Sequence, residues 1–279
     1  MPYLGTFPSL DAGTRPLFAV GVDHSYVGSG DTSYRGLTGK SDAQAISPSV
    51  IGEIPLNEQW FIPVGLRSQN LFLGTVAGAP IPDQVNTLGL NAGVGYRLNN
   101  QWTVAASLGP VIYRFDDFRG DDVGVGGVVR ATYIYSPKLT LVMGLGFEPD
   151  SDLPVLPVAG LRWNIRTNLT LNLMFPRSTL TYRVVPRLNV FAGLGGEFAV
   201  FRTSSDFGNK IGLPQFNSTL GTYRDFHFGA GAEYRLPFGP WLRVESGISF
   251  GREIRYKDIS QTISFDPGPY VQAGLRWRF

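Results

Sequence analysis

The sequence contains no cysteine, so disulfide bonds, thiolate metal sites and cysteine nucleophiles are all excluded. It also lacks the roughly 18 to 20 consecutive apolar residues that a membrane-spanning helix needs. The longest uncharged stretches, such as residues 68–82, are broken by glycine, proline and polar residues. The formal net charge of +2 is too small to indicate a basic surface for nucleic acid, and we expect no such partner. No charged segment followed by an apolar one precedes Pro2, so we expect Met1 to begin a mature chain whose export signal has been removed.

Strict alternation of apolar and polar residues is the main signal that is present. It is clearest in the last ten residues, where successive side chains of a strand would point to opposite faces. One face carries only apolar side chains and the other carries Gln272, Gly274, Arg276 and Arg278; the apolar set is Val271, Ala273, Leu275, Trp277 and Phe279. The pattern recurs along the chain, and no amphipathic helix is available to cover so many apolar faces. We therefore predict an all-β fold, a transmembrane antiparallel up-and-down β-barrel, in preference to a soluble sandwich.

The alternating segments number about fourteen, and we expect them to form one barrel over residues 15–279, with residues 1–14 as an N-terminal periplasmic lead-in. The hairpin of residues 169–184 has arms of only about seven residues, whereas membrane strands have about 9 to 11. Twelve strands therefore stay possible. Short Asn- or Pro-rich turns alternate with connections that are mostly longer, as in outer-membrane barrels; the longer ones are expected at residues 28–43, 74–85, 203–222 and 252–264.

The terminal pattern resembles the C-terminal strand that the barrel-assembly machinery recognises in bacterial outer-membrane β-barrels. The resemblance covers the whole chain, but only in architecture. Length and strand number are similar to those of monomeric fourteen-stranded porins, and an uncharacterised barrel family is equally compatible. The resemblance implies the outer membrane of a Gram-negative-type bacterium, with the assembly machinery, membrane lipid and lipopolysaccharide as partners. We expect a monomer, because the outward faces look evenly apolar.

Strand parity predicts which charged side chains face the lumen. Nine arginines and six acids share the inward phase, which gives an excess of about +3; they are Asp23, Glu53, Arg67, Arg97, Arg130, Arg162, Arg183, Glu197, Asp225, Glu233, Arg235, Arg243, Glu245, Arg276 and Arg278. Charged groups facing lipid would cost about 2 to 4 kcal/mol each at mid-depth for arginine or lysine, so their confinement to one phase supports the assignment. Either a field across a pore or a ladder of salt bridges would account for them.

Glycines also concentrate on the inward phase, at Gly93, Gly95, Gly144, Gly146, Gly193, Gly195, Gly229 and Gly231. Their missing side chains favour an open or loop-restricted lumen. Relief of crowding in coiled strands is the other explanation.

These features predict a porin-like channel for passive diffusion of small hydrophilic solutes, with a weak preference for anions. The first alternative is a structural or adhesive barrel whose lumen is blocked by loops. The second is a lipid-modifying enzyme that uses His24, which has the lipid-facing phase next to inward Ser25. We expect no enzyme, and neither a cofactor nor a metal ion. His227, beside Asp225 at period two, is expected to be a hydrogen-bonded wall group.

A loose acidic cluster lies in one expected loop, at Asp116, Asp117, Asp121 and Asp122. It either holds a divalent cation, bridges lipopolysaccharide or is simply solvated; the last is the expected reading.

Overall fold

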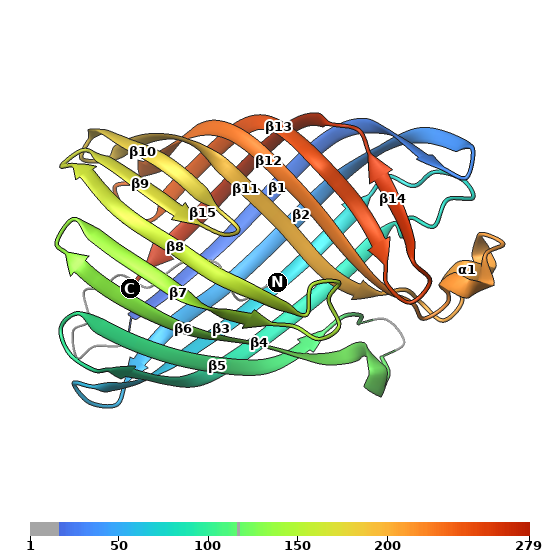
Figure 1. The fold of residues 1–279 in the computed structure, drawn as a ribbon. Helices are drawn as coiled ribbons and strands as arrows, with labels where there is room; N and C mark the ends of the chain where they lie inside the picture. Colours follow the sequence, from blue (N-terminus) through green and yellow to red (C-terminus); the bar gives the residue numbers. More distant parts are fainter. Residues whose placement is uncertain (1–16, 116–117) are drawn as a thin grey trace.

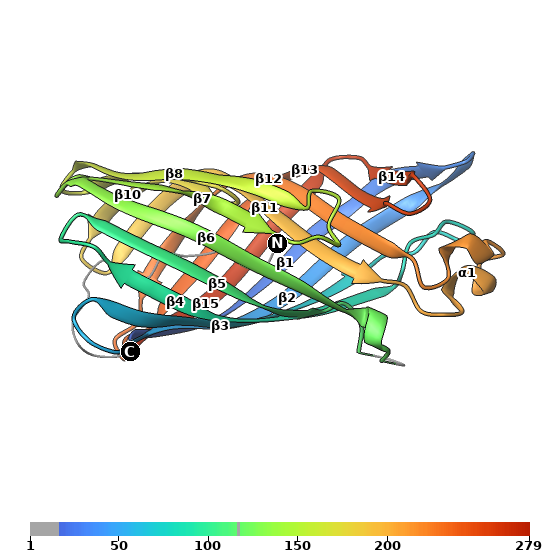
Figure 2. The same ribbon diagram turned by 60° about the horizontal axis from the view of Figure 1, so that its bottom comes forward.

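The computed structural model describes residues 17–115 and 118–279, and in it antiparallel strands close into one barrel (Figures 1 and 2). Neighbours in sequence pair around the wall. The first eight strands are β1 (Leu17–Tyr34), β2 (Leu37–Pro55), β3 (Trp60–Leu73), β4 (Gln84–Arg97), β5 (Trp102–Ile112), β6 (Val123–Ser136), β7 (Leu139–Phe147) and β8 (Val155–Arg166). The others are β9 (Leu169–Met174), β10 (Ser178–Val185), β11 (Leu188–Arg202), β12 (Leu220–Arg235), β13 (Trp241–Tyr256), β14 (Gln261–Phe265) and β15 (Gly268–Arg278).

The wall has fourteen strands, because β14 and β15 are two pieces of one strand. Both pieces pair with β13 on one side and with β1 on the other. Pro267 lies between them, and a proline cannot donate to a ladder. The predicted fourteen-stranded all-β barrel is confirmed, and the twelve-stranded alternative is wrong because the hairpin of β9 and β10 belongs to the wall.

The chain closes where the C-terminal strand meets the first strand. Pairing of β1 with β15 runs from Ala19 opposite Arg278 to Val27 opposite Tyr270. The Phe279 amide also donates to the Phe18 carbonyl oxygen at 2.9 Å. The alternating terminal segment is therefore the seam of the barrel.

The two ends of the barrel differ, and we call them the turn end and the loop end. All connections at the turn end are short, at residues 56–59, 98–101, 137–138, 167–168, 186–187 and 236–240. The loop end carries residues 74–83, 113–122, 148–154 and 203–219, together with the tight turns at residues 35–36 and 257–260. The expected lead-in of residues 1–14 lies outside the described residues.

Two connections predicted as long loops are wrong. Residues 28–43 mostly extend β1 and β2, which turn at Arg35 and Gly36, both with positive φ. Such a two-residue turn suits the twist of a hairpin. Residues 252–264 likewise extend β13 and β14. These extensions are rich in polar residues and glycine, so their alternation is hard to see in the sequence.

In residues 17–115 and 118–279, helix is confined to the loops: one turn of α-helix, α1 (Phe207–Lys210), and two 3₁₀ turns, Gly120–Asp122 and Pro214–Phe216. In the described part of the chain, no helix is long and apolar enough to cross a membrane.

The outward face is apolar, and aromatic side chains mark its turn end. Trp60 packs against Tyr96 and Trp102 against Tyr133, each pair with ring centroids 4.5 Å apart. Large side chains such as Val129, Phe228 and Ile248 stand more than half exposed on this face. An apolar belt edged by aromatic side chains is the arrangement that a barrel presents to lipid.

Candidate solute pathway through the barrel

The inner wall carries ion pairs near the turn end. Glu53 on β2 lies 3.4 Å from Arg130 on β6 and 3.9 Å from Arg97 on β4. On β13, Arg243 binds Glu233 at 2.7 Å and Glu245 at 3.0 Å. Each acid thus has a cationic partner, which compensates for removal of the carboxylate from bulk water.

Arg243 is also packed by an aromatic ring. Its guanidinium carbon lies 3.7 Å from the centroid of the Phe191 ring on β11. The adjacent carboxylate of Glu245 also accepts from Arg177, which follows β9 at the tip of the short hairpin. Arg177 donates in addition to the Gln272 side-chain oxygen of β15 at 3.2 Å. Arg177 thus links the tip of the hairpin to β13 and β15, which lie beyond β11 and β12 in the sheet.

Two more charged groups lie at the seam and in the lumen. Arg276 binds Asp23 at 3.1 Å. Glu197 of β11 accepts hydrogen bonds from Gln69 (3.0 Å) and Ser25 (3.2 Å), and Arg67 lies within electrostatic reach of it. Ser25 on β1 and Gln69 on β3 belong to strands that are not neighbours of β11 in the sheet, so these contacts cross the lumen.

A buried polar group follows on β12 and β13. Asp225 is fully buried and accepts from the Ser249 hydroxyl at 2.5 Å. The His227 ring stacks on Tyr270, with centroids 4.2 Å apart. Arg252 donates to the Ser41 carbonyl oxygen at 2.5 Å, and its guanidinium lies 4.6 Å from the centroid of the Phe265 ring. The prediction that His227 is hydrogen-bonded is wrong: its ring is stacked on Tyr270, and among the described residues neither ring nitrogen has a hydrogen-bond partner.

Four of the predicted lumen arginines behave differently from the rest. Arg162, Arg183, Arg235 and Arg278 are exposed and lie toward the turn end of their strands. Within the described residues none of the four lies within 4.0 Å of an acidic group, and Arg278 lies within electrostatic reach of the arginines Arg276 and Arg162 and of the acid Glu233. The turn end of the lumen is therefore more cationic than its middle.

The loop end of the lumen is filled by apolar side chains, which we call the loop-end plug. Its fully buried members come from the wall and from two loops; they include Leu71, Phe201, Tyr223, Ile254, Tyr256 and Ile263 of the wall and Ala79, Ile81 and Phe216 of the loops. Phe216 packs edge-on against Tyr256, whose hydroxyl donates to the Pro80 carbonyl oxygen at 2.7 Å. The loops of residues 74–83 and 203–219 thus both fold into the loop end of the barrel.

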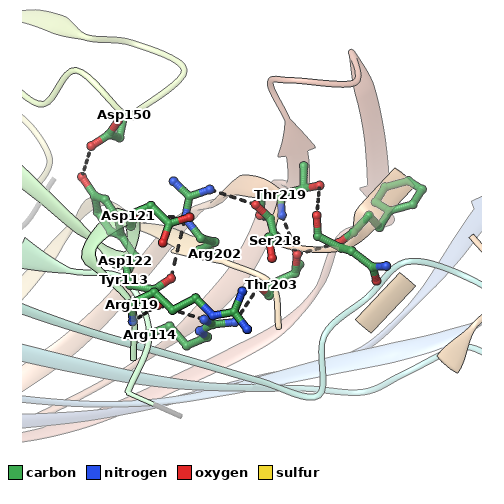
Figure 3. A network of polar contacts seen from close by, with 12 residues as sticks. Tyr113, Arg114, Arg119, Asp121, Asp122, Asp150, Arg202, Thr203, Ser218 and Thr219 are labelled. Carbon is green, nitrogen blue, oxygen red and sulfur yellow. Dashed lines mark hydrogen bonds and ion pairs between the residues drawn. The ribbon is translucent and has the colours of Figure 1, made fainter. Parts of the chain in front are cut away.

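A polar network, which we call the loop clasp, joins the loops above the plug (Figure 3). Asp122 is completely buried and binds Arg114 at 2.8 Å and Arg202 at 3.7 Å. Arg202 further donates to the Ser218 carbonyl oxygen (2.8 Å), and Arg114 to that of Thr203 (3.2 Å). The loop of residues 113–122 is thereby fastened to the loop of residues 203–219.

The clasp changes the interpretation of the predicted acidic cluster. Asp122 is held by two arginines, so its carboxylate does not belong to a solvated cluster. Asp121 is exposed, and Asp116 and Asp117 lie outside the described residues. Among the residues that the structure describes, no group of three or more metal-binding side chains occurs.

The inward glycines do not simply leave empty volume. A Cβ atom on Gly95 would overlap the Phe61 ring, and one on Gly195 would overlap the His227 ring. The prediction that missing side chains open the lumen is wrong at these two positions, because neighbouring rings occupy the space.

His24 was the candidate base for a lipid-modifying enzyme. Its Nε2 atom lies 2.7 Å from the Gln44 side-chain nitrogen, while adjacent Ser25 bonds Glu197 inside the lumen. The bonded partner of His24 is thus an amide, which is neither a nucleophile nor an acid or base.

Four arginines with structural contacts were not predicted from the sequence: Arg114, Arg202 and Arg252 toward the loop end, and Arg177 at the tip of the short hairpin. All four lie in or next to segments that the sequence predicts to be loops or strand ends. In such segments strand parity does not predict to which face a side chain points. The sequence offers one signal for such a contact: Arg114 lies near a strand end and beside an acid-rich loop, which suggests an ion pair.

A family model described as a domain of unknown function, DUF6268, matches residues 57–278. The chain belongs to this family. No curated protein sequence matches it.

Three solved structures are similar to this family member, and the first of them, with a TM-score above 0.5, shares its fold. A FadL homologue from Pseudomonas aeruginosa has 10% identity and a TM-score of 0.51, over 95% of this chain and 90% of that one. The COG4313 outer membrane channel from Pseudomonas putida F1 has 12% identity and a TM-score of 0.49, over 99% and 100% of the two chains. The NanC porin has 9% identity and a TM-score of 0.41, over 92% and 98%. The predicted resemblance to outer-membrane β-barrels is confirmed at the level of the fold.

Proposed function

We propose that this protein is an outer-membrane channel for passive diffusion of small hydrophilic solutes, with a weak preference for anions. The observation that carries the proposal is a set of exposed arginines at the turn end that form no ion pair with any described residue: Arg162, Arg183, Arg235 and Arg278. The lumen acids, by contrast, are neutralised by arginines or hydrogen-bonded. Fixed cationic side chains along a pore raise the local concentration of anions.

An outer-membrane location is supported by the apolar outward belt and its aromatic edge, and by the alternating C-terminal strand that closes the barrel. In an outer membrane the turn end would face the periplasm, because short connections lie on the periplasmic side of such barrels. The loop-end plug then faces outward. Passage along the axis therefore requires the loops of residues 74–83 and 203–219 to withdraw, which makes the loop clasp the element that sets how often the channel opens.

The test is conductance in planar bilayers under a salt gradient. We expect discrete channel events and a reversal potential on the anion-selective side. Changing the four arginines together to glutamine should remove that selectivity while current persists. Changing Lys138 and Arg187, which lie in turns outside the wall strands, serves as the matched control and should leave selectivity unchanged.

The plug and the clasp favour a second candidate, a structural or adhesive barrel whose loops bind an external partner and whose lumen stays blocked. A correctly folded barrel that passes no ionic current, even when the clasp is broken, would reject the channel and leave this candidate.

A further inference from the structure

Two arginines from separate parts of the wall approach each other through the lumen near the turn end. Arg162 lies on β8, four residues before its end at Arg166, and Arg278 ends β15. Both side chains have the inward phase of their strands, which they share with buried Val158 and buried Tyr270. In the sheet, β9 to β13 separate the two strands on one side and β1 to β7 on the other. Arg278 is nevertheless within electrostatic reach of Arg162, so the two guanidinium groups lie on facing parts of the inner wall.

Neither of these arginines is neutralised by an acid. Both are exposed, and among the described residues no acidic group lies within 4.0 Å of either guanidinium. Glu233 is within electrostatic reach of Arg278, but Arg243 already binds it at 2.7 Å. Two like charges that face each other without a counter-charge repel. An anion between them would remove that repulsion.

A third arginine borders the same space and is already paired. Arg276 lies two residues before Arg278 on the inner face of β15 and within electrostatic reach of it. It binds Asp23 of β1 at 3.1 Å. Three arginines less this one acid leave two uncompensated positive charges, those of Arg162 and Arg278.

Deeper in the lumen, the next arginine has acids beside it. Arg67 of β3 lies within electrostatic reach of Arg276, but also of Glu197 and Asp23. The charges in the middle of the lumen therefore compensate one another. The uncompensated pair is a feature of the turn end.

The chemistry of the guanidinium group indicates the kind of anion. An arginine binds a carboxylate or a phosphate through two parallel N–H···O bonds. An anion with a single negative charge neutralises one arginine of the pair and leaves the other repelled by nothing but still unpaired. An anion with two negative charges, whose oxygens point in two directions, pairs with both arginines at once.

We propose that Arg162 and Arg278 form a binding site for a dianionic solute, which is held between β8 and β15 by one guanidinium group on each side. The inference rests on the proposed channel function and narrows its anion preference to solutes that carry two carboxylates or one phosphate. Two fixed positive charges at this point raise the local concentration of a dianion more than that of a monoanion.

Binding can be measured without ionic current, by titration calorimetry on the barrel folded in detergent. The probes are succinate, phosphate at about pH 8, where it is mainly a dianion, and acetate as the monoanionic control. Low ionic strength is needed because salt screens exposed charges. We expect one saturable site for succinate, for phosphate or for both, and none for acetate at the same concentration. Binding of succinate alone would assign two separated carboxylates, and binding of phosphate alone a single tetrahedral group; either supports the dianion site.

Variants at the two positions show whether one ligand bridges them. Arg162→Gln and Arg278→Gln should each weaken dianion binding about tenfold or more. The double variant should lose little beyond either single one, because both side chains hold the same ligand and their effects are not additive. Arg187→Gln removes a cation from the turn between β10 and β11, at the same end of the barrel but outside the wall strands, and should bind as the parent does.

Several results would overturn the site. These are binding of acetate as tight as that of the dianions, unchanged binding in both single variants, or an equal loss in Arg187→Gln. Should Arg278→Gln, next to the closing residue of the barrel, fail to fold, Arg162→Gln on the facing wall answers the same question. A barrel that binds dianions but passes no current in planar bilayers would reject the channel and leave the binding site. A conducting barrel that does not distinguish succinate or phosphate from acetate would reject the site and leave the channel.

Discussion

The main-chain amide of Arg202 donates to the carbonyl oxygen of Tyr113 at 3.4 Å, although β6 to β10 lie between β5 and β11 in the sheet. The loop end of the barrel is thus drawn together across its own lumen. The side chains of the loop clasp reinforce this contact, with Asp122 buried between Arg114 and Arg202. Together they keep the loops of residues 113–122 and 203–219 over the mouth.

Removing the Asp122 carboxylate should loosen the mouth. Asp122→Ala leaves two arginines without their acid, and breaking a buried pair of this kind costs about 3 to 5 kcal/mol. We expect longer or more frequent open events in planar bilayers and faster proteolysis of residues 203–219. Asp121→Ala, at the exposed neighbouring position, should change neither; equal behaviour of the two variants would mean that the clasp does not control the loops.

Arg243 should be a main determinant of stability in the lumen. It forms ion pairs with Glu233 and Glu245 and packs on Phe191, so Arg243→Ala removes the ion-pair partner of Glu233 and leaves Glu245 with Arg177 alone. We expect a loss of about 3 to 5 kcal/mol in urea unfolding from lipid vesicles. Arg235→Ala, exposed and unpaired, should change the unfolding free energy by less than about 0.5 kcal/mol.

The sequence predicts those strands in which apolar and polar residues alternate. Strands such as β5 to β7 and the closing strand β15 have apolar residues on one phase, and their bounds follow from that phase. The polar extensions of β1 and β2 could not be found in this way, because on both faces they carry Ser, Thr, Gly and Asp. Their pairing depends on the turn at Arg35 and Gly36, which is a local backbone property.

Parity indicated which charged residues share the inner face, but it could not show which of them pair. Glu197 bonds Ser25 and Gln69 across the lumen, a contact that depends on how far the barrel is flattened and not on strand phase. The loop-end plug was missed for related reasons. Leu71 is apolar on the inward phase, and Ile254 turns inward only because the register of β13 against β12 shifts between Phe250 and Glu253.

The closing strand should be sensitive at its last residue. The Phe279 ring packs on Trp277 with centroids 5.1 Å apart, and its main chain bonds Phe18 in both directions. Phe279→Ala keeps the main-chain bonds and removes the ring, so we expect a lower yield of heat-modifiable, folded barrel in outer-membrane fractions. Phe279→Tyr should restore the yield, whereas unchanged yield in the alanine variant would show that the aromatic terminus is dispensable for assembly.

The contact of Gly95 with Phe61 predicts that a single added methyl group will disturb the lumen. In Gly95→Ala the new Cβ would overlap the Phe61 ring, which is 1% exposed and has little room to move. Overpacking of this kind costs about 1 to 3 kcal/mol, and urea unfolding in vesicles would measure it. Gly120→Ala is the matched control, because nothing lies within 4 Å of the added atom there. Shortening the ring in a Gly95→Ala, Phe61→Leu double variant should recover part of the loss, since the two residues share one space and their effects are not additive. Strict additivity of the two changes would mean that the glycine is needed for strand curvature and not for the ring.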